Sequence, residues 1–131
     1  MKKLFAVCLS LCLAVALFAV PAFAEEDVAQ VEGGAAYSTL QAAIDAVQTS
    51  GKVTLLKDTQ ENITIPEGKS IELVLSANLT NQSDHTIVVK SGATLTISGS
   101  GTVDNVTHQR AAIHNEVGGT VFLNGGTYTR S

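Results

Sequence analysis

Gly-Ala-Thr-Leu-Thr-Ile-Ser-Gly-Ser-Gly-Thr-Val, residues 92–103, is the stretch that decides the fold, because parts of it return later in the chain. Residues 119–123, Gly-Thr-Val-Phe-Leu, match its first half, and residues 126–128, Gly-Thr-Tyr, match its last three residues. Apolar and polar residues alternate in each run, and the runs end at Gly, Asn or Ser. This pattern indicates short strands joined by turns.

The runs belong to a longer repeat with a period of about 24 residues, which lies in the range typical of a solenoid. The equivalent positions are Ile63, Ile87 and Ala111; Ile65, Val89 and Ile113; Leu55, Leu79, Val103 and Tyr128; and the turn residues Gly68, Gly92 and Gly118. We therefore predict an all-β protein, a short parallel β-helix of about three coils over residues 52–131. Equivalent residues should lie directly above one another, and the extra residues of the last repeat are expected near Glu116.

The same register places Asn81 under Asn105, with Lys57 below and Arg130 above. Like amides at matching turns can form a hydrogen-bonded ladder between stacked strands. Asparagine is also common in turns for purely local reasons, so the sequence leaves both interpretations open.

Residues 37–51 are predicted to form an amphipathic helix. Ser38 precedes Gln41 by three residues, which is the capping-box spacing, and Gly51 stands where the helix should end. The apolar stripe of this helix consists of Leu40, Ile44 and Val47. Because the end of a β-solenoid is an open sheet edge, we expect this helix to cover the N-terminal edge.

The helix and the repeats together resemble a known superfamily. Residues 37–47, Tyr-Ser-Thr-Leu-Gln-Ala-Ala-Ile-Asp-Ala-Val, followed by residues 51–56, are similar to the opening of pectate-lyase-like β-helix proteins. Residues 88–103 and 119–128 resemble repeats of large bacterial cell-surface, adhesin-like β-helix proteins. The resemblance implies a right-handed parallel β-helix, and it implies no particular activity because fold does not fix function.

Residues 1–24 resemble a secretory signal. Lys2 and Lys3 precede a run of apolar and small residues, and Ala22-Phe23-Ala24 fits a small-x-small cleavage site. Retention of the run as a membrane anchor is the alternative. We expect cleavage, export to the cell surface or the medium, and a bacterial source. Residues 25–36 are expected to form a flexible leader.

Composition narrows the range of partners. After residue 24 the chain has 6 Lys and Arg against 12 Asp and Glu, so its net charge is −6, and it has no Cys. An acidic chain without basic clusters is a poor nucleic-acid binder, and a disulfide scaffold or Cys-ligated metal is excluded. We expect no nucleic-acid partner, and no membrane contact after cleavage. An extracellular glycan or cell-wall polymer is the expected kind of ligand.

Candidate catalytic groups are few. Asp104, His108, Arg110 and His114 gather in one segment, which could be a small acid–base or metal site, or a solvated loop between coils; the loop is favoured. Asp84, Asp104 and Glu116 lie in three different turns, so no carboxylate pair is predicted. His85 receives no role. We therefore name no catalytic, cofactor-binding or metal-binding residues and no cofactor.

The last repeat strand is followed directly by Thr129, Arg130 and Ser131. Because terminal repeats need a cap, the sequence predicts that the coils are incomplete at the C-terminus, and that further coils or self-association cover this edge.

The sequence leaves three functions open. The first is a non-enzymatic exported scaffold or adhesin-like segment. The second is the N-terminal portion of a polysaccharide lyase or glycoside hydrolase, and the third is a glycan-binding module. Enzymatic activity is left uncertain, with its absence favoured.

Overall fold

A computed structural model describes residues 27–107 and 109–131, which form three sheets and one short helix. The largest sheet contains β2 (Ala29–Val31), β3 (Ala36–Tyr37), β4 (Ser50–Leu55), β7 (Ser70–Leu75), β10 (Thr94–Gly99) and β13 (Thr120–Leu123). The second contains β5 (Thr59–Gln60), β8 (Leu79–Thr80), β11 (Thr102–Asp104) and β14 (Thr127–Thr129). The third contains β6 (Ile63–Ile65), β9 (Ile87–Val89) and β12 (Ile113–Asn115). The helix is α2 (Leu40–Ala46).

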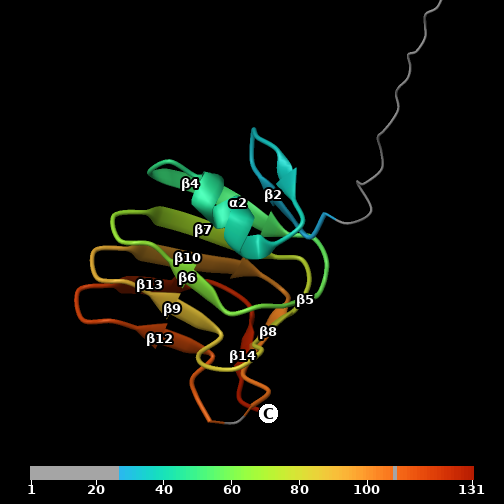
Figure 1. The fold of residues 1–131 in the computed structure, drawn as a ribbon, viewed down its shortest axis with the longest axis vertical. Helices are drawn as coiled ribbons and strands as arrows, with labels where there is room; N and C mark the ends of the chain where they lie inside the picture. The colour runs from blue at the N-terminus through green and yellow to red at the C-terminus, as the bar shows by residue number, and fades with distance from the viewer. Residues whose placement is uncertain (1–26, 108) are drawn as a thin grey trace, which may run out of the picture.

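The strands from β4 onward form a parallel β-solenoid of about three turns. The chain visits the three sheets in a fixed order, and each new strand pairs in parallel with the strand one coil earlier (Figure 1). Alternating apolar residues make this arrangement favourable, since every second side chain points inward and equivalent residues of successive coils stack. The predicted all-β parallel solenoid with a period near 24 is confirmed.

The core consists of columns of stacked aliphatic side chains. One column runs Val53, Leu73, Ile97 and Leu123. Another runs Ile63, Ile87 and Ile113. The first three members of the longer column are fully buried, whereas Leu123 in the last coil is 52% exposed. Burial of a core side chain therefore depends on the coil that follows it.

The turn glycines were predicted correctly. Gly68, Gly92 and Gly118 have φ angles of 83°, 81° and 93°, in the left-handed region that residues with a Cβ rarely adopt. Each lies immediately before the residues that lead into a strand of the largest sheet. The recurring glycine therefore marks the same corner of every coil.

Two parts of the predicted register are wrong. Leu55 pairs with Leu75, and Thr59 pairs with Leu79, so the first coil is four residues shorter than expected. Near the C-terminus, Ile113 pairs with Ile87, so neither Ala111 with Ile87 nor Ile113 with Val89 is a stacked pair. The extra residues of the last repeat lie between Asp104 and Ile113, and not near Glu116.

The helix is shorter than predicted, and its cap is one residue later. Thr39 is the N-cap, and its hydroxyl oxygen accepts a hydrogen bond from the backbone N–H of Ala42. The helix ends at Ala46, and Gly51 lies in β4. Leu40, Ala43 and Ile44 face the core and are buried. The seven-residue length leaves no room for a helix spanning residues 37–51.

Residues of the first two coils hold α2 at both ends. The Glu61 carboxylate accepts hydrogen bonds from the backbone N–H groups of Leu40 (2.7 Å) and Gln41 (3.2 Å). The Lys69 ammonium donates to the backbone carbonyls of Ile44 and Asp45. Negative charge at the start of a helix and positive charge at its end are both favourable. The Gln41 side-chain amide bonds the backbone N–H and carbonyl of Thr64 in β6.

Sequence reasoning missed a hairpin. β2 and β3 pair antiparallel, in a range that was expected to be mostly leader, and β2 also pairs antiparallel with β4. Ala29 of β2 is fully buried. Figure 1 shows this hairpin and α2 at the β4 end of the solenoid.

The predicted signal at residues 1–24 lies outside the described residues. Within the described part of the chain, no helix is long and apolar enough to cross a membrane.

Candidate functional site

At one corner of the solenoid, the connection between two strands becomes longer from coil to coil. The connection from the second sheet to the third contains residues 61–62 in the first coil, 81–86 in the second and 105–112 in the third. Insertions in repeat proteins collect on one face, and this face is often the binding face. This corner, called the long-loop corner (residues 81–86, 105–107 and 109–112), is therefore the candidate functional site.

Two buried asparagines build the base of the long-loop corner. Asn81 and Asn105 are both fully buried and occupy equivalent positions in successive coils. The Asn105 amide donates to the carbonyls of Asp84 (3.0 Å) and Ala111 (3.1 Å). The Asn81 amide donates to the carbonyls of Ser83 and Asp84, and its oxygen accepts from the N–H of Val106. A buried amide whose groups are satisfied fixes the surrounding backbone.

The stacked positions of Asn81 and Asn105 agree with the prediction, but the details of the ladder differ. The two side chains are linked through Thr107, whose hydroxyl accepts from Asn81 (3.1 Å) and donates to Asn105 (2.9 Å). Because Gln60 pairs with Thr80, the coil position below Asn81 belongs to Glu61 and not to Lys57. The asparagines thus stabilise turns within and between coils.

Charged and aromatic side chains near the long-loop corner also contact one another. The Asp84 carboxylate is 3.4 Å from Nε of Arg110 and 3.8 Å from Nε2 of His85. The imidazole rings of His85 and His114 are stacked, with centroids 4.3 Å apart and planes 16° from parallel. Nδ1 of His85 accepts a hydrogen bond from the backbone N–H of Ala111 (3.1 Å). His85 therefore connects the two long loops.

Asp104, Arg110 and His114, which are close together in the sequence, have different partners in the fold. The Asp104 carboxylate accepts hydrogen bonds from the Thr129 hydroxyl (2.8 Å) and from Ser131. Arg110 pairs with Asp84, and His114 stacks on His85. His108 lies outside the described residues. Sequence reasoning missed Asp84 and His85 because their partners lie far along the chain, in the next coil.

A shallow hollow of about 490 Å³ opens at this corner. The residues that line it all have polar or charged side chains and are Gln82, Ser83, Asp84, Thr107, Gln109 and Arg110. Amide, hydroxyl, carboxylate and guanidinium groups together can both donate and accept hydrogen bonds. Such a lining suits a hydroxyl-rich ligand. In the described part of the chain, no group of three or more His, Cys, Asp or Glu side chains is placed to hold a metal ion.

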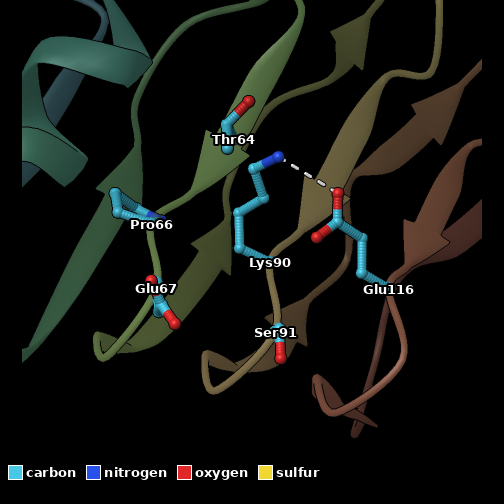
Figure 2. Close-up of a pocket in the computed structure, with 6 residues that line it drawn as sticks. All are labelled: Thr64, Pro66, Glu67, Lys90, Ser91 and Glu116. Carbon is cyan, nitrogen blue, oxygen red and sulfur yellow. Dashed lines mark hydrogen bonds and ion pairs between the residues drawn. The ribbon is translucent and has the colours of Figure 1, made fainter.

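A second hollow, of about 400 Å³, follows the ends of β6, β9 and β12 (Figure 2). It lies beside Thr64, Pro66 and Glu67 of the first coil, Lys90 and Ser91 of the second, and Glu116 of the third. The Lys90 ammonium donates to the Glu116 carboxylate at 3.1 Å across one coil step. This hydrogen bond holds the pKa of Glu116 below its ordinary value. The pair is exposed and contributes little to stability.

The pKa of one aromatic side chain near the C-terminus is shifted. Tyr128 is partly buried, and burial raises the pKa of its phenol above the ordinary value. Its hydroxyl donates to the Gly125 carbonyl. This contact stays within the last turn, so Tyr128 has a structural role in the β14 corner.

Comparisons with known proteins do not assign this chain. It matches no protein-family model, no curated protein and no solved structure. Its function must therefore be inferred from the residues of the chain itself.

Proposed function

We propose that this protein is an exported, non-enzymatic β-solenoid scaffold that acts at the cell surface as an adhesin-like segment. The observation that carries this proposal is the difference between the ends of the core columns. Val53 is fully buried at the β4 end, where β2 pairs with the edge, while Leu123 is half exposed at the β13 end. Exposed apolar side chains at the β13 end of the described coils are suited to joining another structure, because exposed apolar surface favours association.

The contacts of the two best catalytic candidates support a structural role. Asp104 binds Thr129 and Ser131, the last residues of the chain, and so ties the final strand to the third coil. Arg110 contacts Asp84 and joins two successive loops. Each group bridges neighbouring coils.

Finer features of the fold belong to the same proposal. We propose that the solenoid is right-handed and of the pectate-lyase-like kind, on the basis of the helix text of residues 37–47 and the repeats of residues 88–103. We also propose that α2 is its N-terminal cap. The hydrogen bonds of Gln41 to the backbone of Thr64 support this role, since they satisfy groups on β6, which pairs with β9 on its other side. Export rests on the signal-like residues 1–24.

A glycan-binding module is the second candidate. The specific observation in its favour is the hollow at the long-loop corner, which side chains of two long connections, residues 81–86 and 105–112, line with hydrogen-bonding groups. Glycan hydroxyls are donors and acceptors, as are the groups that line this hollow. The N-terminal portion of a polysaccharide lyase or glycoside hydrolase remains the third candidate, with its active coils elsewhere.

The scaffold proposal is tested by incubating the protein with polygalacturonate and other acidic polysaccharides in the presence of calcium. We expect no new reducing or unsaturated sugar ends above a buffer control. Turnover that is lost in Asp104→Asn or in Arg110→Gln, but kept in the exposed control Glu67→Gln, would establish catalysis and overturn the proposal. Binding without turnover, removed by Arg110→Gln, would instead favour the glycan-binding module.

A further inference from the structure

The outer edge of β13 has no neighbouring strand among the described residues. β13 pairs with β10 on one side, and it is the last strand in its sheet (Figure 1). Inward-facing residues at this end are partly or half exposed, although their partners one coil earlier are fully buried. These residues are Ile113, Val121, Leu123 and Tyr128. The end therefore presents both unused backbone groups and apolar side chains.

At the opposite end of the same sheet, the edge of β4 is paired with an additional strand. There β2 runs antiparallel to β4, with Ala29 opposite Leu55, Gln30 opposite Thr54 and Val31 opposite Val53. The outer residues of β2 are apolar and lie over the buried residues of β4, while the central Gln30 is exposed. A three-residue antiparallel strand with apolar first and third residues thus completes the terminal strand of this sheet.

β13 has this same pattern. Val121 and Leu123 continue the inward columns, and Phe122 lies on the outward row between them and is 53% exposed. Residues 117–129 contain no charged residue and no proline, the usual protections of a free edge. Two such strands can therefore meet without like-charge repulsion.

We propose that the β13 edge docks a second copy of this chain, with the two β13 strands paired antiparallel about a twofold axis. The inference rests on the proposed scaffold role and names its partner. A twofold axis through Phe122 places this residue opposite Phe122 of the second copy, and Val121 opposite its Leu123. This register matches inward apolar residues on both sides, whereas a shift by one residue would set them against outward ones.

A charge exchange at position 122 tests this pairing. We expect the protein to sediment at twice the monomer mass as its concentration rises, and Phe122→Lys to weaken association by about tenfold, since like charges directly opposite are destabilising. Phe122→Glu should weaken it similarly, and an equimolar mixture of the two variants should restore the dimer. The control is Thr96→Lys, one coil inward on the same outward row, which should leave association unchanged.

Cysteine cross-linking provides a second test that does not depend on charge. In a background with Cys8 and Cys12 changed to Ala, Phe122→Cys should give a disulfide-linked dimer under mild oxidation, and Thr96→Cys should remain monomeric on a non-reducing gel. A monomer at every concentration, or variants that fail to restore each other, would overturn the inference. Polysaccharide turnover by a dimeric protein would instead overturn the scaffold proposal and leave the pairing standing.

Discussion

The two ends of the solenoid are built from the same kinds of residue and have different surroundings. At the β4 end, Val53 and Leu55 are fully buried because β2 pairs with the edge of β4 and α2 packs its apolar face against the core. At the β13 end, Leu123 ends the column that begins at Val53 and is half exposed, and Val121 ends the column of Ile71 and Leu95 and is partly exposed. In a solenoid, the burial of a residue is therefore set by the next structural layer and not by its own coil.

The largest effect is expected when a side chain of one core column is truncated to Ala, once in the middle of the column and once at its end. Leu73→Ala removes a fully buried side chain between Val53 and Ile97 and should lower the free energy of unfolding by about 2–5 kcal/mol. Leu123→Ala acts on the half-exposed end of the same column and should cost about 1 kcal/mol. Urea unfolding of both variants at low protein concentration measures the difference. Equal losses would contradict the contrast between the ends.

A second test concerns the interior of the long-loop corner. Asn105→Ala removes a fully buried amide that donates two hydrogen bonds, to the carbonyls of Asp84 and Ala111, and should cost about 1–3 kcal/mol. The matched control is Asn115→Ala in the last coil, where an exposed amide donates to the Gly119 carbonyl. Thermal unfolding should separate the two variants, and an equal shift in both would show that the buried amide has no special role.

A third and smaller effect is expected at the attachment of α2. Glu61→Gln removes the charge that accepts hydrogen bonds from the N–H groups of Leu40 and Gln41, and it should cost about 1.5 kcal/mol. Hydrogen exchange should then accelerate in α2 and at the β4 end while the β10 amides stay protected. The exposed Glu67→Gln serves as the control. Faster exchange throughout the chain would mean that Glu61 acts globally.

The smallest effect concerns the exposed Lys90–Glu116 pair near the β12 end. Because its folded pKa lies below the unfolded value, Glu116 contributes stability at pH values above the unfolded pKa. That contribution is lost as the pH falls through the folded pKa. Carboxyl NMR titration should place the pKa of Glu116 below its ordinary value, and Lys90→Met should move it upward. A titration that Lys90→Met does not change would contradict the assigned cause.

The sequence was sufficient for the parts of the fold that repeat. Gly68, Gly92 and Gly118 could be found because a positive φ at each corner requires the same residue, and Ile63 and Ile87 because inward positions must be apolar. The register of Leu55 was wrong because the corner connection is shorter in the first coil. A periodic pattern reports the average coil and not the length of each loop.

The candidate site was less predictable than the fold. The ion pair of Asp84 with Arg110 and the stacking of His85 on His114 arise between loops of unequal length. Neither contact can be derived from the period of the repeat. The hairpin of β2 and β3 was also missed, since strands of three and two residues are too short for a clear alternation.

Methyl–methyl NOE contacts measure the central claim, the parallel stacking of successive coils, most directly. We predict cross-peaks between Leu73 and Ile97, between Ile97 and Leu123, and between Ile63 and Ile87, together with Ile87 and Ile113. Backbone contacts should follow the parallel register of β7, β10 and β13. Antiparallel contacts between these strands, or the absence of the Leu73–Ile97 and Ile63–Ile87 cross-peaks in assigned spectra, would contradict the solenoid.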